Sequence, residues 1–168
     1  MITINTAPAV GASVSEVRVV GIRGGFTFEQ AVDHFASIGA EVVLLEPSVV
    51  CGKDHVVSAV MHAERAFAEG RNRAKTLLTE IVLYAACERQ IGKALKKMKP
   101  TDGTAGMVAA VLNYPGDLVL SELGAESDDS LYAPSEEKAR NLGAELFDGV
   151  SPGDAVLEQV AMVDLMKM

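Results

Sequence analysis

The sequence predicts an α/β fold in a single domain, with a small three- to four-stranded sheet packed with a layer of helices. Its 168 residues fit one domain, and 49% of them are hydrophobic, which is enough to bury a core of useful size. Short runs typical of strands alternate with longer runs typical of helices, and glycine or proline separates them. We expect a flexible N-terminal segment at 1–15, an α/β domain at 16–145 and a helical C-terminal extension at 146–168.

Three stretches are predicted to be strands. EVRVVGIRG at 16–24 alternates along most of its length and ends at a glycine turn. The continuous apolar runs at 41–45 and 107–113 are typical of strands buried on both faces. Between the first two strands, Thr27 and Gln30 form the capping-box pattern that starts a helix.

Three helices are predicted between the second and third strands, over about 53–69, 73–86 and 88–98. The middle helix is apolar on nearly all sides, so most of its surface must be covered. The pattern at 117–123 fits a strand or a helix equally well. Two further helices are predicted to begin near Pro134 and Pro152, because proline is favoured in the first turn of a helix.

Charge is distributed unevenly along the chain, whose formal net charge is −8. Residues 51–100 carry ten basic and five acidic side chains, a net of +5. Residues 101–168 carry three basic and thirteen acidic side chains, a net of −10. The acidic total therefore hides a basic middle segment, and it does not exclude a nucleic-acid surface.

The composition argues against several classes of protein. Two cysteines, Cys51 and Cys87, give neither a disulfide framework nor a four-ligand zinc site, and free cysteines suit a reducing cytoplasm. No apolar run has membrane-spanning length, and the N-terminus lacks the features of a secretory signal. We expect a cytoplasmic protein with no metal, no cofactor and no membrane contact.

No arrangement of residues predicts catalysis. Cys51 lies four residues before His55, which would allow a nucleophile and its base, but both cysteines are better explained as small core residues. His55 and His62 are seven residues apart, too far for the usual pair of metal ligands on one helical turn. We expect no catalytic residues, and a stand-alone small-molecule enzyme using Cys51 and His55 is the alternative.

The basic segment carries the strongest functional signal. Its middle helix is predicted to start among Arg71, Asn72, Arg73 and Lys75, and Arg89 opens the next helix. The helix dipole disfavours cations at a helix start, whereas the unpaired backbone N–H groups there attract anions. The sequence fits an anion contact and a solvated charged corner about equally.

Spaced residues through the middle of the chain resemble the small regulatory subunit of the KEOPS complex, in its archaeal form. Eukaryotic relatives are known as the PRPK-binding protein. The pattern of this family is matched at Gly70, Asn72, Ala74, Thr76, Leu77, Glu80, Tyr84, Arg89, Gln90 and Ile91. The resemblance covers about 17–142. Cys87 departs from it, because a glycine is common at that position.

The resemblance implies a non-catalytic subunit of α/β fold in a complex that installs threonylcarbamoyl on the adenosine beside the tRNA anticodon. Family members bind the complex's kinase-like ATPase subunit and help to recruit tRNA through its single-stranded CCA end. We expect the kinase-like subunit to contact Leu77, Ile81, Leu83 and Tyr84 on the middle helix. We expect tRNA to contact Lys53, His55, Asn72, Arg73, Lys75 and Arg89.

A homo-oligomeric scaffold is a third possibility, in which the apolar middle helix pairs with its own copy. Both this idea and kinase docking rest on the expectation that the four partner-binding residues cannot all face one core. The lysine row at 93–99 is predicted to be an ordinary solvated face. No contact with DNA is expected.

Overall fold

Five strands form one sheet in the computed structural model, which describes residues 2–3, 15–102 and 106–167. The strands are β1 (Ile2–Thr3), β2 (Glu16–Gly24), β3 (Glu41–Leu45), β4 (Gly106–Leu112) and β5 (Ala125–Ser127). Their order is β1-β2-β4-β3, and β5 pairs with the other end of β2. All of these pairings are antiparallel. β4 is central and completely buried, whereas β3 forms an edge of the sheet.

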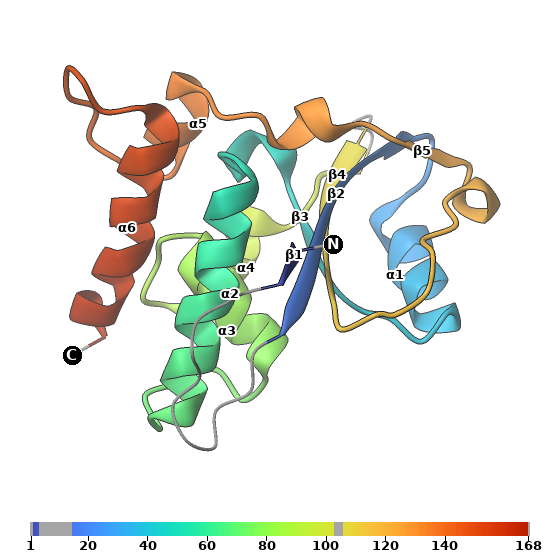
Figure 1. Ribbon diagram of the computed structural model, residues 1–168, viewed down its shortest axis with the longest axis horizontal. Coiled ribbons are helices and arrows are strands. Elements are labelled where there is room, and N and C mark those ends of the chain that lie inside the picture. The colour runs from blue at the N-terminus through green and yellow to red at the C-terminus, as the bar shows by residue number, and fades with distance from the viewer. Residues whose placement is uncertain (1, 4–14, 103–105, 168) are drawn as a thin grey trace.

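Helices cover both faces of this sheet, which confirms the predicted fold class. They are α1 (Phe28–Ser37), α2 (Lys53–Ala68), α3 (Leu77–Ala85), α4 (Ile91–Met98), α5 (Glu136–Asn141) and α6 (Pro152–Met166). α1 lies alone on one face, and the others lie on the opposite side (Figure 1). Each face has its own apolar core, because successive side chains of a strand point to opposite sides of a sheet.

The predicted starts of the first two helical segments are confirmed in detail. Thr27 caps α1, and the Gln30 side chain bonds back to the cap backbone, so the capping box is present. α2 begins after Gly52, as expected for a helix over about 53–69. The segment at 117–123 is neither strand nor regular helix, because it contains only a short 3-10 turn at Ser121–Leu123.

The start of α3 was predicted four residues too early. Thr76 is its cap, with the side-chain oxygen accepting from the Thr79 N–H, and residues 70–76 form a loop before it. This segment, named here the 70–76 loop, contains Asn72, Arg73 and Lys75. The sequence had suggested that these residues lie in the first helical turn, but they lie in the loop before it.

The expectation that the apolar residues of α3 cannot share one core is also wrong. Ile81, Leu83 and Tyr84 are each 0% exposed, and Leu77 is partly buried. α3 contacts α2, α4, β3 and α6, so its own fold surrounds it. These three side chains offer no surface to a partner in this conformation.

The two ends of the chain attach to the domain differently. Ile2–Thr3 pair with β2 as β1, and the Ser15 backbone N–H donates to Glu64 (3.3 Å), while the rest of the predicted 1–15 segment lies outside the described residues. At the other end, α6 contributes Val156, Val160 and Val163 to the core shared by α2, α3 and the sheet. Figure 1 shows α6 alongside α2.

Candidate functional site

An apolar groove of about 270 Å³ runs beside the edge strand β3. The side chains that line it come from both faces of the sheet and are almost all hydrophobic. α1 provides Phe28, β3 provides Val42, Val43 and Leu44, α3 provides Leu78 and Val82, and α4 provides Leu95 and Met98. We call this feature the edge groove.

One cation stands at the rim of the edge groove. Lys99 follows α4, and its Nζ lies 5.4 Å from the centroid of the Phe28 ring. Leu95, one turn earlier, exposes 46% of its surface. An exposed apolar strip next to a cation is suited to a protein partner that carries apolar side chains and a carboxylate.

His55 is a structural residue. Its Nδ1 accepts from the Cys51 backbone N–H (3.0 Å), and its Nε2 donates to the Ala85 carbonyl (2.8 Å). Burial lowers the pKa of His55 to about 4, so the ring is neutral near pH 7. A ring with both nitrogens occupied and 1% exposure is not presented to a base in this conformation, so the geometry gives the predicted tRNA contact of His55 no support. It is equally unable to act as a base for Cys51.

Cys87 closes α3 in a left-handed conformation. Its φ is +57°, its N–H donates to the Tyr84 carbonyl, and the Glu88 N–H donates to the Leu83 carbonyl. This is the Schellman arrangement, which favours glycine at the Cys87 position. The departure from the family pattern therefore keeps the backbone that glycine would adopt. Burial raises the pKa of Cys87 to about 12, so its thiol is a poor nucleophile.

The six predicted tRNA-binding residues do not form one site. Lys53 and His55 lie at the start of α2, whereas Asn72, Arg73 and Lys75 lie beyond its end. A helix of 16 residues is about 24 Å long. Arg89 does return to the 70–76 loop, because its carbonyl lies 3.4 Å from the Arg73 guanidinium.

The anion at the start of α3 is supplied by the chain itself. Glu80 Oε1 accepts from the backbone N–H groups of Arg73 (3.0 Å) and Ala74 (2.9 Å). Glu80 Oε2 accepts from Lys167 Nζ (2.5 Å), and the Glu80 side chain is 0% exposed. The N–H groups predicted to attract an external phosphate are therefore already occupied.

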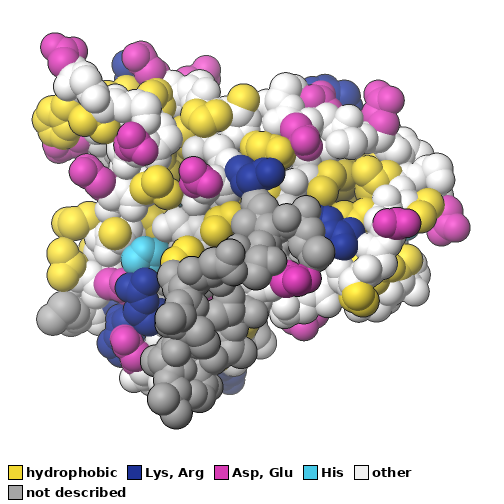
Figure 2. Space-filling view, viewed as in Figure 1, with side chains coloured by type: hydrophobic (Ala, Val, Ile, Leu, Met, Phe, Trp, Pro, Cys, Tyr) yellow, Lys and Arg dark blue, Asp and Glu magenta, His cyan; other side chains and the backbone are white. Residues whose placement is uncertain are grey.

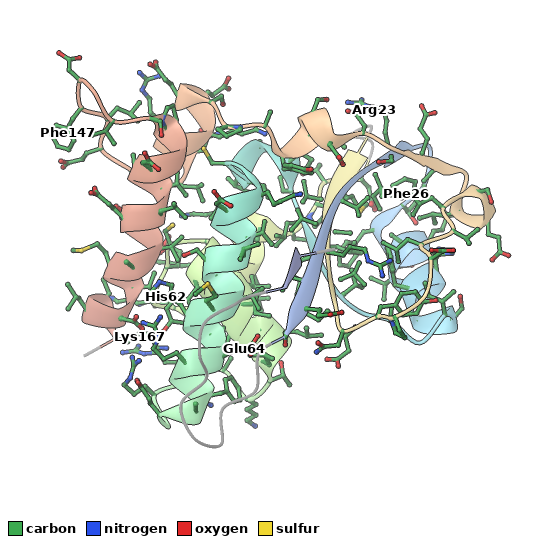
Figure 3. The ribbon with its side chains drawn as sticks, in the orientation of Figure 1. Arg23, Phe26, His62, Glu64, Phe147 and Lys167 are labelled. Carbon is green, nitrogen blue, oxygen red and sulfur yellow. The ribbon has the colours of Figure 1, made fainter. Side chains whose placement is uncertain are left out.

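A second carboxylate, Asp164 of α6, extends this internal network. It accepts from Tyr84 Oη, from His62 Nδ1 (3.0 Å) and from Arg71 Nη1 (3.1 Å). Burial alone would raise the pKa of Asp164, but these hydrogen bonds outweigh it and hold the pKa below its ordinary value. In Figure 3, His62 and Lys167 lie close together at the end of α6.

Arg73 completes the network through backbone carbonyls. Its guanidinium donates to Lys167 O (3.0 Å) and Arg89 O. We name this set the C-terminal polar cluster; it consists of His62, Arg71, Arg73, Glu80, Tyr84, Asp164 and Lys167. Figure 2 shows the histidine beside basic and acidic side chains at this corner.

Within the part of the chain that the structure describes, Lys53, Lys75 and Arg89 make no side-chain hydrogen bond or ion pair. Of these, Lys75 and Arg89 flank the C-terminal polar cluster. The cluster was not predicted, although the lone carboxylate of Glu80 in an apolar helix was a signal for it. The apolar run of α3 likewise contained Leu78 and Val82, which line the edge groove.

Two negative findings apply to the described residues. None of their helices has the length and apolar character needed to span a bilayer. No group of three or more His, Cys, Asp or Glu side chains among them is placed to hold a metal ion.

Comparison with known proteins identifies the family of the chain. Residues 28–149 match the family described as kinase binding protein CGI-121. The chain belongs to this family. It is also similar to the regulatory protein Cgi121 of Methanocaldococcus jannaschii, with 29% identity over 150 residues, which span 88% of this chain and 97% of that protein. The family predicted from the sequence is confirmed.

Proposed function

We propose that this chain is the non-catalytic regulatory subunit of an archaeal, cytoplasmic KEOPS complex, which forms threonylcarbamoyl-adenosine beside the tRNA anticodon. In this role it binds the kinase-like ATPase subunit and helps to recruit tRNA through the CCA end. Membership of a family described as kinase binding supports the first contact, and the name of its relative supports the regulatory role.

We place the kinase-like subunit on the edge groove. Ile81 and Leu83 are buried in the core, while Leu78 and Val82 of the same helix line the groove. This assignment replaces the predicted contacts at Leu77 and Ile81 by their neighbours Leu78 and Val82. Leu77 itself is partly exposed and adjoins Leu78 in the chain. The groove joins exposed apolar surface to an open sheet edge, and this observation carries the proposal.

We place the tRNA contact at Lys75 and Arg89, together with Asn72 of the 70–76 loop. Their charges have no partner among the described side chains, so they remain available to phosphates. The Asn72 amide nitrogen donates to the Ala74 carbonyl (2.9 Å), and its side-chain oxygen remains as an acceptor for a base edge. Arg73 positions this loop, and Lys53 lies too far away to join the same contact.

The geometry of His55 weighs against a stand-alone enzyme, because both ring nitrogens bond to backbone groups. A homo-oligomer through α3 would need Ile81, Leu83 and Tyr84 on the surface, and they are buried.

Co-purification with the kinase-like subunit of the same genome tests the proposal. Val82→Glu should abolish co-elution, because a carboxylate buried in an apolar interface shifts its pKa or costs several kcal/mol. Val119→Glu is the matched control, since Val119 is 50% exposed and lies outside the groove. Co-elution of folded Val82→Glu at the wild-type level would place the contact elsewhere. A wild-type chain that binds neither the kinase-like subunit nor tRNA would refute the proposed function.

A further inference from the structure

The open edge of β3 has two backbone positions without partners. Just before the strand, the Ala40 N–H points away from β4 and donates to the Phe35 carbonyl (3.0 Å). Just after it, the Glu46 N–H donates to the Met98 carbonyl (2.9 Å). Alternate residues of a strand direct their backbone groups to the same side. The ladder agrees: Asn113 donates to Glu16 of β2, so the alternate residues Leu112, Ala110 and Val108 of β4 bond toward β3, where they lie opposite Glu41, Val43 and Leu45. The backbone groups of Val42 and Leu44 therefore point away from β4, and no described residue outside the sheet bonds to them.

The edge groove surrounds these two positions with apolar side chains on both faces of the sheet. Val42 and Leu44 belong to the α1 face, together with Phe28. Leu78, Val82 and Leu95 line the groove on the other face. A segment paired with β3 would direct its side chains alternately to these two sides. Both sets of its side chains would meet hydrophobic partners, as in a strand buried on both faces.

From these observations we propose that the partner occupies the edge groove as an extended strand that pairs with β3 at Val42 and Leu44. This inference rests on the proposed function and deepens it, because it commits to one occupant. The occupant is a segment of the kinase-like subunit with apolar residues on both faces and an aspartate or glutamate opposite Lys99. The charge of Lys99 at the rim supplies the complementarity.

A helix or a flat protein surface fits this groove less well. Either would bury the outward N–H and carbonyl groups of Val42 and Leu44 without hydrogen-bonding them, and buried backbone groups are rarely left unpaired. A paired strand satisfies them in the way by which sheet edges recognise extended peptides. The chain's own β1 is not the occupant, because it pairs with β2 on the opposite side of the sheet.

Amide hydrogen exchange, read residue by residue by NMR, tests the pairing. The full-length chain is measured alone and in complex with the kinase-like subunit of the same genome. We expect exchange at Val42 and Leu44 to slow by about a hundredfold or more in the complex, as for amides of an inner strand. Unchanged exchange at both amides, in a complex that Val82→Glu still abolishes, would overturn the strand pairing and leave the proposed function standing.

A proline substitution tests the same pairing by affinity. Val42→Pro removes an outward N–H but no bond to β4, a position at which edge strands tolerate proline. We expect it to weaken binding by about thirtyfold or more, whereas Val42→Ala, which keeps the N–H, weakens it by about fivefold at most. Equal effects of the two variants would contradict the inference. Thermal unfolding verifies the fold of Val42→Pro, and if it does not fold, the exchange measurement decides.

Two further outcomes are distinct. If sedimentation shows the chain alone to be a dimer with Val42 and Leu44 already protected, the occupant is a second copy and the inference is wrong. If no complex with the kinase-like subunit forms at all, the kinase-binding part of the proposed function fails first and the inference fails with it.

Discussion

The edge groove and the C-terminal polar cluster use opposite faces of the same helix. Leu78 and Val82 of α3 face the groove, while Glu80 and Tyr84, two positions away on the helix, face the cluster. On the first face, apolar surface and backbone groups are left without partners. On the second, every charge of the cluster has an internal partner. Of these two faces, the apolar one therefore keeps unpartnered groups of its own, whereas the charged residues left for a ligand lie beside the cluster, at Lys75 and Arg89.

The largest effect is expected from removing the charge of Lys167 from the C-terminal polar cluster. Lys167 bonds to Glu80 Oε2 and to Tyr84 Oη (2.9 Å), and both members of the ion pair are buried. Lys167→Met should lower the free energy of unfolding by about 3–5 kcal/mol, because it leaves a buried carboxylate without its cation. Denaturant titration measures this loss.

The double variant Glu80→Gln/Lys167→Met separates charge from packing. It should recover part of the stability lost in Lys167→Met, because the uncompensated charge is gone. If Lys167→Met unfolds like the wild type, the network contributes little to stability.

The second effect concerns the junction of α2 with the end of α3. His55 has a pKa of about 4 when folded and an ordinary value of 6.5 when unfolded. Only the unfolded chain takes up the proton between these values, so stability falls as the pH drops from about 6.5 to about 4. Above pH 6.5 this histidine does not change the stability with pH. Between pH 6.5 and pH 4 it lowers the free energy of unfolding by about 3 kcal/mol in total. Unfolding of wild type and His55→Gln, measured across this range, should differ in slope; parallel curves would contradict the assignment.

The local parts of the fold could be predicted from the sequence, because neighbouring residues determine them. The capping box at Thr27 and Gln30 and the apolar runs of β3 and β4 needed only short-range patterns. The start of α3 could not be predicted, since Glu80 holds the 70–76 loop by tertiary hydrogen bonds to Arg73 and Ala74.

The candidate site was predictable only in part for the same reason. Lys167 meets Glu80 across 87 positions of sequence, and no local pattern indicates such a contact. The length of α2 separates Lys53 from Lys75, although both are basic residues at or just before the start of a helix. The edge groove arises where α1, α3 and α4 meet β3, which depends on the order of the strands. Helix periodicity placed Leu78 and Val82 in an apolar helix without indicating which of its sides stays open.

A third prediction concerns tRNA binding by Lys75 and Arg89, the two basic residues beside the C-terminal polar cluster. Lys75→Glu or Arg89→Glu should weaken tRNA binding by about tenfold and reduce the salt dependence by about one counterion each. Filter binding at several salt concentrations measures both quantities. Lys93→Glu, at an exposed lysine of α4, is the control and should have a smaller effect. The lysine row at 93–99 is not solvated throughout, because Lys97 pairs with Glu88 (3.1 Å) and donates to the Ala86 carbonyl (3.0 Å).

Removal of the CCA end should weaken tRNA binding as Lys75→Glu does, and the two changes should not add. Arg73→Glu should mainly destabilise the fold, because its guanidinium bonds to the Lys167 and Arg89 carbonyls. If Lys75→Glu leaves the difference between intact and CCA-less tRNA unchanged, the CCA end binds elsewhere.

The smallest effect is expected at Cys87, where α3 ends and the chain turns toward α4. In a helix, glycine is about 1 kcal/mol less stable than alanine. At Cys87 the order should reverse, because the left-handed φ of +57° costs an L-residue about 1–2 kcal/mol that glycine does not incur. Cys87→Gly should therefore be about 1 kcal/mol more stable than Cys87→Ala. Ala86 is the matched control, since its φ of −74° is helical and Ala86→Gly should destabilise. Thermal or denaturant unfolding measures both comparisons. If Cys87→Ala is as stable as Cys87→Gly or more stable, the left-handed cap is contradicted.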